Sequence, residues 1–243
     1  MHRFFASKSQ FSDSYVTIQG DDVKHISKVL RLRPGDKISV CDKEKTDYIC
    51  EIKEINKDTV IAEIEEKSEN PNESSLEVTL YQGLPKGEKM DYIIQKCVEL
   101  GVCNIVPVIM KRTVVKPQAA SSKTQRWQRI AEEAAKQCMR GIIPHVEEPV
   151  SFETMLERLE AEDLVILPYE NEKCHKLKDV LKQGADKRKI GVIIGPEGGF
   201  EEEEVESASR NGAQAVTLGP RILRCETAPV ATISALMYEL GDW

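Results

Sequence analysis

The first third of the chain is dominated by short segments in which apolar and polar residues alternate. These segments are residues 15–18, 37–41, 48–52 and 59–64. A period of two is typical of strands that bury one face, and the regular spacing of the four segments predicts a small barrel. Residues 21–32 predict a helix instead, with Asp21 or Asp22 as its cap and an apolar stripe on one face. Pro34 and Gly35 follow it and prevent its continuation.

After residue 75 the pattern changes to apolar runs that alternate with amphipathic segments. Strands are predicted at residues 76–81, 105–110, 164–167, 190–194 and 213–218. Helices are predicted at residues 89–100, 123–140, 151–159, 201–211 and 227–240. Strand–helix alternation of this kind favours an open, mostly parallel sheet with helices on both sides, so the fold class is α/β.

The two patterns are separated by a polar stretch, residues 68–75, which contains a proline and no apolar anchor. Such a composition is typical of an interdomain linker. We therefore predict a β domain over residues 1–70 and an α/β domain over residues 76–243.

Composition narrows the class of protein. The chain has 243 residues and seven cysteines, and no Cys-x-x-Cys or Cys/His spacing typical of a metal site occurs.

The N-terminus lacks the apolar region of a signal peptide, and no apolar run is long enough to span a bilayer, so we expect a cytoplasmic protein with no membrane association. The four acids at 201–204 fall in the first turn of a predicted helix, whose dipole favours negative charge, and we predict no metal there.

Charge is unevenly distributed along the chain. The formal net charge is −7, but residues 84–142 hold 11 Lys and Arg against five Asp and Glu, a net of +6. A basic segment inside an acidic chain is compatible with a phosphate-binding face, and equally with an ordinary solvated helix surface.

Two glycine-containing turns are the strongest candidates for a ligand site. Gly195-Pro196-Glu197-Gly198-Gly199-Phe200 follows one predicted buried strand, and residues 218–228 (LGPRILRCETA) follow the next. Each leads into a helix, so its backbone can approach a ligand closely with free N–H groups. Because open α/β sheets bind ligands at the carboxyl ends of strands, we expect the two turns to form one pocket.

Common catalytic and cofactor signatures do not describe this pocket. The turn at 195–200 lacks the spacing of a dinucleotide fingerprint, no phosphate-binding Gly-Lys-Ser/Thr sequence occurs, and the four histidines have no partner at a telling spacing. Composition and spacing therefore support only an α/β ligand-binding protein with a small β domain. A non-catalytic RNA-binding protein remains open as an alternative, and so does a nicotinamide-dependent oxidoreductase, which the missing fingerprint disfavours.

The sequences of the two turns resemble the motifs of the SPOUT class of RNA methyltransferases. Within that class the chain resembles the ribosomal small subunit methyltransferase E family. The likeness extends over nearly the whole chain, through His2-Arg3-Phe4-Phe5, Lys89-Met90-Asp91, Glu99-Leu100-Gly101, Arg112 and Arg140. Cys225 departs from it, at a position where threonine is more usual, and we expect its side chain to pack against the pocket.

The resemblance implies a fold and an activity. The expected fold is an N-terminal PUA-like β-barrel followed by a SPOUT domain with a deep trefoil knot, which the periodicity itself does not indicate. The implied reaction is methylation of N3 of a uridine in 16S rRNA, free or within the small ribosomal subunit, with S-adenosylmethionine as cofactor. The resemblance also implies a homodimer, for which the small residues of the last helix offer a contact face.

The methyl-donor site follows from the same resemblance, and the catalytic and RNA-binding residues are hypotheses from the chemistry of the reaction. S-adenosylmethionine is expected against Leu167, Pro168, Gly195, Gly198, Leu218, Gly219, Ile222 and Leu223. For catalysis, Arg224 is expected to stabilise negative charge on the uracil carbonyls, and Glu226 to orient that arginine or, less favoured, to accept the proton. A helix-capping carboxylate is a nearly equal alternative for Glu226. Contacts to the rRNA backbone are expected from Arg3, Arg31, Lys86, Arg112, Arg140 and Arg221.

Overall fold

The computed structural model describes residues 1–114 and 123–243, which form two compact units. The small unit consists of residues Met1–Glu73 and Ala135–Ile143, and the large unit of residues Ser74–Ala134 and Pro144–Trp243. The domain ranges 1–70 and 76–243 stay a prediction. The structure adds that a segment from the middle of the sequence completes the small unit.

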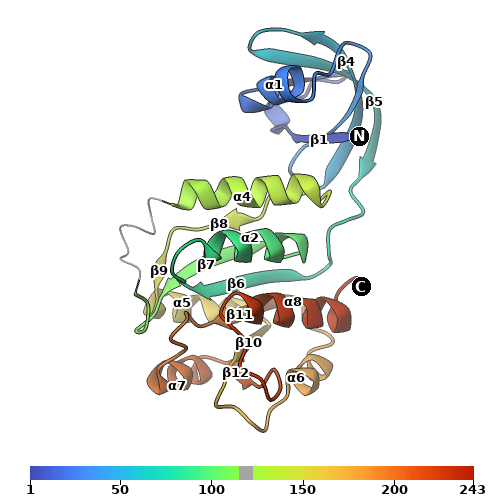
Figure 1. Cartoon of the computed structure of the whole chain (residues 1–243). Coiled ribbons are helices and arrows are strands. Elements are labelled where there is room, and N and C mark those ends of the chain that lie inside the picture. Colours follow the sequence, from blue (N-terminus) through green and yellow to red (C-terminus); the bar gives the residue numbers. More distant parts are fainter. Residues whose placement is uncertain (115–122) are drawn as a thin grey trace. The chain divides into compact units, whose positions relative to one another are not determined.

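The small unit is built on a five-stranded sheet with the strand order β1-β3-β4-β5-β2 (Figure 1). All its pairings are antiparallel except that of β1 with β3. The strands are β1 (His2–Phe5), β2 (Tyr15–Gln19), β3 (Lys37–Cys41), β4 (Thr46–Ile55) and β5 (Thr59–Glu69). The sheet surrounds a core that includes Phe4, Ile38 and Ile52, and the four strands predicted from alternation are confirmed.

Short helical segments complete the small unit. They are η1 (Lys8–Gln10), α1 (Asp21–Lys24) and η2 (His25–Val29), the last of which is a π-helical turn. The helix predicted at residues 21–32 is thus present but shorter. It ends before Arg31, whose φ of 55° lies in the left-handed region that a helix cannot continue through.

The large unit contains a seven-stranded, all-parallel sheet. Its main strand order is β12-β10-β11-β6-β7-β8, and β9 also pairs with β7. The strands are β6 (Glu77–Gly83), β7 (Asn104–Ile109), β8 (His145–Val146), β9 (Val150–Ser151), β10 (Leu164–Pro168), β11 (Lys189–Ile194) and β12 (Ala213–Val216). The predicted parallel α/β sheet is confirmed; the trefoil knot stays a prediction.

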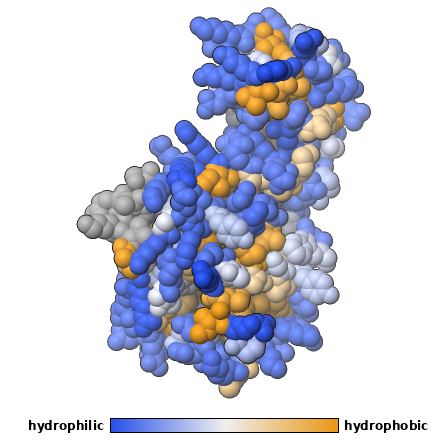
Figure 2. Space-filling model, in the orientation of Figure 1, coloured by the Kyte–Doolittle hydropathy of each residue, from blue (hydrophilic) through white to orange (hydrophobic). Residues whose placement is uncertain are grey.

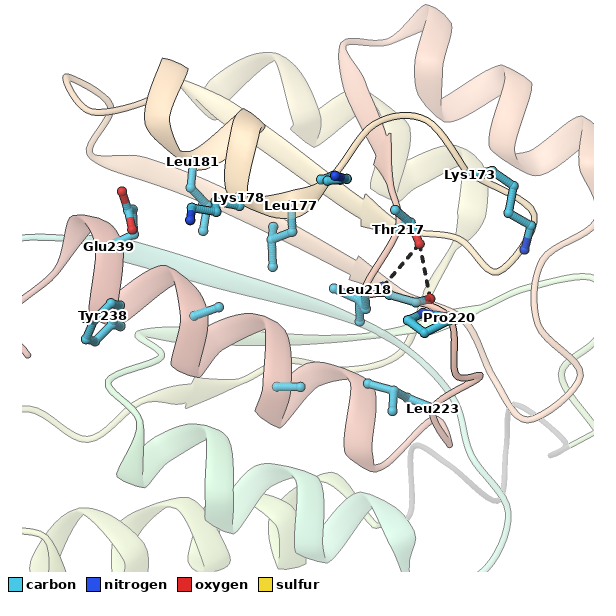
Figure 3. A pocket seen from close by; sticks show the side chains of 14 residues that line it. Lys173, Leu177, Lys178, Leu181, Thr217, Leu218, Pro220, Leu223, Tyr238 and Glu239 are labelled. Carbon is cyan, nitrogen blue, oxygen red and sulfur yellow. Dashed lines mark hydrogen bonds between the residues drawn. The ribbon is translucent and has the colours of Figure 1, made fainter.

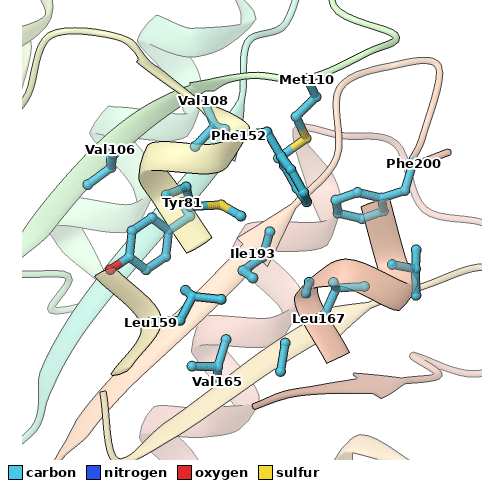
Figure 4. Close-up of a cluster of buried hydrophobic side chains, with 14 residues drawn as sticks. Tyr81, Val106, Val108, Met110, Phe152, Leu159, Val165, Leu167, Ile193 and Phe200 are labelled. Carbon is cyan, nitrogen blue, oxygen red and sulfur yellow. The ribbon is translucent and has the colours of Figure 1, made fainter. Parts of the chain in front are cut away.

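Helices cover both faces of this sheet. They are α2 (Lys89–Glu99), α4 (Thr124–Gln137), α5 (Phe152–Arg158), η3 (Leu159–Ala161), α6 (Leu177–Gln183), α7 (Glu202–Arg210) and α8 (Thr227–Leu240), with the end of α4 belonging to the small unit. On one face, α5 and α7 pack through Phe152, Met155 and Val205 on strand residues such as Leu167 and Ile193 (Figure 4). On the other, α8 packs against α2, α6 and β11.

Candidate active site

The two glycine-containing turns lie at the same edge of the parallel sheet. The first, residues 195–200, follows β11, and the second, residues 217–226, follows β12; we call them the first loop and the second loop. Strand β10 lies between β11 and β12 and ends at Pro168, so three carboxyl ends are adjacent. The sequence-based expectation that the two loops meet is confirmed, because both line a common cavity.

The first loop is fixed by close backbone packing. A Cβ added to Gly83, at the end of β6, would lie 2.6 Å from both the N and the Cδ of Pro196. Gly199 has a φ of 69°, and its N–H donates to the carbonyl of Pro196 at 2.9 Å, which closes a tight turn. Glycine is needed at both positions, at Gly83 for lack of space and at Gly199 for its left-handed backbone.

Arg112 holds the first loop from the end of β7. Its Nη1 donates to the carbonyl of Gly198 at 2.8 Å, and its Nε and Nη2 donate to the carboxylate of Glu201 at 2.9 and 3.2 Å. The Arg112 and Glu201 side chains are only slightly buried. Their bidentate contact, together with the hydrogen bond to the Gly198 carbonyl, nevertheless orients the loop. The pKa of Glu201 is lowered, chiefly by the hydrogen bond from Arg112.

The acidic run at 201–204 begins α7, as predicted. Glu201 and Glu204 form a reciprocal capping box, and the Glu204 carboxylate also accepts from the backbone N–H of Lys111 at 2.8 Å. Lys111 pairs through its ammonium with Glu203. Helix capping and neighbouring cations therefore account for these acids. Within residues 1–114 and 123–243 there is no group of three His, Cys, Asp or Glu side chains placed to hold a metal ion.

The second loop turns sharply at Gly219, whose φ is 104°. The N–H of Gly219 donates to Thr217 Oγ1 at 3.2 Å, and at the other end the N–H groups of Thr227 and Ala228 donate to the carbonyl of Arg224 at 2.8 and 2.9 Å. Glu226 occupies the N-cap position of α8, but its side chain makes no capping hydrogen bond. The side-chain hydrogen bond that a capping role would make is therefore absent, and the carboxylate contacts Cys225 and Lys89.

Two adjoining cavities lie at the loops, one between the two loops and the other beside the second loop. The larger has a volume of about 370 Å³ and the smaller about 90 Å³, and both are lined by Pro168, Glu170, Ile222, Leu223 and Ala228. Of the residues predicted to hold the methyl donor, Gly195 and Gly198 line the larger cavity, and Leu218 and Gly219 line the smaller. Leu167 is fully buried in the core beneath and supports the site from below.

A cluster of charges lies at the larger cavity. Glu226 Oε2 accepts from the Cys225 thiol at 3.2 Å and lies 3.3 Å from Lys89 Nζ, while Glu226 Oε1 is 4.0 Å from Arg224 Nη1. Lys89 Nζ also lies 3.1 Å from Glu197 Oε1. Lys89 was not among the predicted site residues, although it lies in one of the segments that carry the family resemblance.

The protonation states in this cluster follow from its contacts. Burial alone would raise the pKa of Glu226, but the Cys225 thiol and the Lys89 ammonium outweigh it, so the pKa lies below its ordinary value. Burial and the neighbouring carboxylate of Glu226 raise the pKa of Cys225 to about 12. Cys225 therefore remains a thiol near neutral pH; it is buried at the cavity, as expected for its packing role.

Two of the predicted RNA contacts require correction. Arg3 is 6% exposed and donates to Asp47 at 2.7 and 3.1 Å, and Arg140 is 3% exposed and pairs with Glu73 at 2.9 Å. Both guanidinium groups are committed to buried ion pairs inside the small unit, so they are not available to a phosphate. Arg31, Lys86 and Arg221 are exposed, and Arg112 is partly exposed beside Glu201.

An apolar groove of about 790 Å³ lies beside the second loop, between α6 and α8 (Figure 3). Leu177 and Leu181 of α6 and Leu218 and Leu223 of the second loop form its walls, with Ala231, Ala235 and Tyr238 of α8. Hydrophobic residues gather over α8 and its surroundings in the surface view of Figure 2. Ile222 and Tyr238 are 84% and 72% exposed, which is unusual for such large side chains.

None of the helices in the described residues is long and apolar enough to cross a membrane.

Comparisons with known proteins show which family the chain belongs to. A family model described as an RNA methyltransferase domain matches residues 72–237, and one described as an RNA methyltransferase PUA domain matches residues 18–65. The chain is 34% identical to ribosomal RNA small subunit methyltransferase E of Bacillus subtilis, over 98% of this chain and 97% of the relative. It is 35% identical to the protein of that name from Synechocystis, over 97% of this chain and 78% of the relative.

A solved structure extends the comparison. The crystal structure of a ribosomal RNA small subunit methyltransferase E from Neisseria gonorrhoeae, bound to S-adenosyl methionine, superposes with a TM-score of 0.91 at 36% identity. The match covers 100% of this chain and 99% of that one.

Proposed function

Because the chain belongs to the ribosomal RNA small subunit methyltransferase E family, we propose that it methylates N3 of a uridine in 16S rRNA, with S-adenosylmethionine as the methyl donor. The observation that carries this proposal is the meeting of the first and second loops around one cavity that Arg224 also lines, with Glu226 Oε1 4.0 Å from the Arg224 guanidinium. A non-catalytic RNA-binding protein would have no use for such a cavity.

The residues around the cavity fit the donor. Apolar side chains such as Leu223 and the ring of Pro168 offer a surface for an adenine ring, and the glycine-containing loops offer backbone N–H and C=O groups for its polar edge. A volume of about 370 Å³, extended by the adjoining cavity, lies within the usual range for small-molecule sites. When bound, the donor supplies an electrophilic methyl group on a positively charged sulfur.

The protein's part in methyl transfer is mainly to position and to stabilise charge. Uridine N3 must lose its proton, which leaves negative charge on N3 and the two flanking carbonyl oxygens. Arg224 is suited to stabilise this charge, since its guanidinium lines the cavity, is 82% exposed and lies 4.0 Å from Glu226. Such a guanidinium lowers the barrier without covalent chemistry once Glu226 orients it toward the uracil.

Glu226 is better suited to orient Arg224 than to accept the proton. Its lowered pKa makes the carboxylate a weaker base than an ordinary glutamate. Its Oε1 faces Arg224, and its Oε2 is taken by Lys89 and Cys225. The N3 proton then leaves to solvent, directly or through water at the mouth of the cavity.

RNA binding is assigned to exposed cations of both units. Arg221 of the second loop and Lys86 before α2 are candidates for phosphate contacts on the large unit, and Arg31 on the small unit. Arg112 is retained as a candidate with a second role, since it already holds Glu201. Because N3 lies on the pairing edge of uracil, a paired target must be unpaired or flipped out first.

The proposal includes a homodimer that acts in the cytoplasm. The groove between α6 and α8 is the best candidate for the contact face, because its small residues Ala231 and Ala235 allow close helix approach and its rim exposes Tyr238.

Primer extension on 16S rRNA tests the proposed function. A methyl group on N3 blocks base pairing and stops reverse transcriptase, so a stop present in wild-type cells should vanish in cells that lack the gene, and should return when the gene is restored. Persistence of every such stop after deletion would show that the uridine N3 assignment is wrong. Calorimetry with S-adenosylmethionine tests the cofactor separately, since absence of binding heat would exclude the enzyme.

A further inference from the structure

Lys89 is placed to act on both loops at once. It is the first residue of α2, and its ammonium lies 3.1 Å from Glu197 of the first loop and 3.3 Å from Glu226 of the second. The strands that precede these loops, β11 and β12, are not neighbours, because β10 lies between them. The ammonium therefore joins two loops that the sheet itself does not pair.

The contacts of Glu197 fix one end of this link. Its Oε1 accepts from the backbone N–H of Lys86 at 2.9 Å in addition to the Lys89 ammonium. Burial would raise the pKa of Glu197, but these two partners outweigh it and leave the pKa lowered. The pKa of Lys89 is raised, first by its hydrogen bond to Glu197. All three groups are therefore charged near neutral pH, and the link is an ion pair at each end.

The contacts of Glu226 divide between its two oxygens. Oε2 lies against Lys89, and Oε1 faces Arg224. Lys89 thus fixes the orientation of the Glu226 carboxylate, whose Oε1 remains available to the Arg224 guanidinium. Without the ammonium, the carboxylates of Glu197 and Glu226 would have no cation between them, and both would be driven to turn away or to bind protons.

We propose that Lys89 is a positioning residue of the methyl-transfer site, which ties the first loop to the second and holds Glu226 ionised and turned toward Arg224. This inference rests on the proposed function. It assigns Lys89 no contact with the substrate: its effect on the reaction passes through Glu226.

The test compares Lys89→Met with wild type in single-turnover methyl transfer to 16S rRNA at saturating S-adenosylmethionine. The neutral, similarly long side chain should lower the rate constant by one to two orders of magnitude, while the dissociation constant for S-adenosylmethionine changes only a few-fold. The acid limb of the pH–rate profile should move to higher pH, because Glu226 loses the cation that lowers its pKa. Lys89→Arg keeps the charge and should restore most of the rate.

Lys96→Met is the matched control. Lys96 lies on the same helix, has the same side-chain exposure of 33% and also forms an ion pair, with Glu99 at 2.8 Å, but it does not line the cavity. Its removal should leave the rate and the pH profile unchanged. A double-mutant cycle adds a second criterion: Lys89→Met should cost little in a Glu226→Gln background, since the group through which it acts has already lost its charge.

The outcomes separate the two proposals. A wild-type protein that transfers no methyl group to the rRNA overturns the function and this inference together. If wild type is active and Lys89→Met matches it in rate and pH profile, only the positioning role falls. The role also falls if Lys89→Arg is as inactive as Lys89→Met, or if the effects of Lys89→Met and Glu226→Gln are simply additive.

Discussion

Gly83 and Pro196 pack against each other with no room for a side chain between them: a Cβ at residue 83 would lie 2.6 Å from the Cδ of Pro196. This contact joins the end of β6 to the first loop. The loop therefore owes its position to the sheet beneath it as well as to its own turn.

We predict that Gly83→Ala displaces the first loop. Overpacking of this kind costs about 1–3 kcal/mol of folding free energy, and the displaced loop should weaken S-adenosylmethionine binding at least tenfold. Gly212→Ala is the control, because Gly212 has a φ of 91° but open space around it, at the end of α7. It should lower stability without changing affinity for the donor. Equal affinities of Gly83→Ala and wild type, measured by calorimetry, would contradict the prediction.

Arg224→Ala should abolish methyl transfer yet leave donor binding within a few-fold of wild type. The side chain is 82% exposed and its ion pair with Glu226 is a long one, at 4.0 Å, so its removal should not disturb the fold. Calorimetry and a methyl-transfer assay on the same preparation measure the two effects. Loss of donor binding together with activity would refute the catalytic assignment.

The buried pair of Arg140 and Glu73 should be essential to the small unit. Glu73 accepts from the guanidinium and from the N–H groups of Gly141 and Ile142 at 2.7 and 3.1 Å, with both side chains of the pair at most 5% exposed. Removal of one partner of a buried ion pair typically costs about 3–5 kcal/mol, so Glu73→Ala should lower the unfolding midpoint of the small unit in urea. Glu44→Ala, at an exposed pair with Lys8, should leave the midpoint nearly unchanged, because solvent screens such a pair.

Glu162 should make stability depend on pH. Burial raises its pKa, although the hydroxyl of Tyr81 donates to it at 3.0 Å. The folded state therefore binds this proton more tightly than the unfolded chain, so the contribution of Glu162 is fully present below the unfolded pKa and is lost as pH rises through the folded pKa. Glu162→Gln keeps an acceptor for Tyr81 and should gain stability relative to wild type between about pH 4 and 7. The measurement is the free energy of unfolding of both proteins, obtained by urea titration at several pH values in that range. A difference between Glu162→Gln and wild type that stayed constant with pH would contradict the prediction.

The groove between α6 and α8 gives a prediction on assembly. Ala235→Glu places a charge among the apolar walls and should convert the proposed dimer to a monomer in analytical ultracentrifugation. Tyr92→Glu is the control, since Tyr92 is 49% exposed on α2 and lines none of the three cavities described above. A wild-type chain that sediments as a monomer at micromolar concentration would refute the dimer.

The period of the apolar residues predicted most of the fold, because most helices and strands bury one continuous apolar face. Helix α8 was predicted with its observed limits, since its apolar face runs without interruption to Gly241. Several short elements were missed, among them β1, β8, β9 and α6. Strand β1 spans only four residues, too short for a period to be recognised, and α6 buries Leu177, Val180 and Leu181 within a lysine-rich segment that resembles a solvated surface.

The site was predicted less completely, because its charges depend on contacts between distant segments. Sequence alone does not distinguish an arginine that binds phosphate from one buried in an ion pair, which is why Arg3 and Arg140 were misassigned. Lys89 is separated by more than a hundred residues from both carboxylates that it contacts, and no local spacing links them. The two glycine-containing loops could be recognised because each is defined by residues that are consecutive in the sequence.

The discontinuity of the small unit has a consequence for how the chain is made. Glu73 and Arg3 bind groups of residues 140–142, which are synthesised almost seventy residues after the linker. During synthesis on the ribosome, the buried polar groups of the N-terminal sheet therefore lack these hydrogen-bond partners until residues 140–142 have been made. A fragment that stops at residue 73 would leave Glu73 without its partners and would take the Arg140 carbonyl from Arg3, which keeps only Asp47 of these contacts, and we expect it to be recovered poorly in isolation.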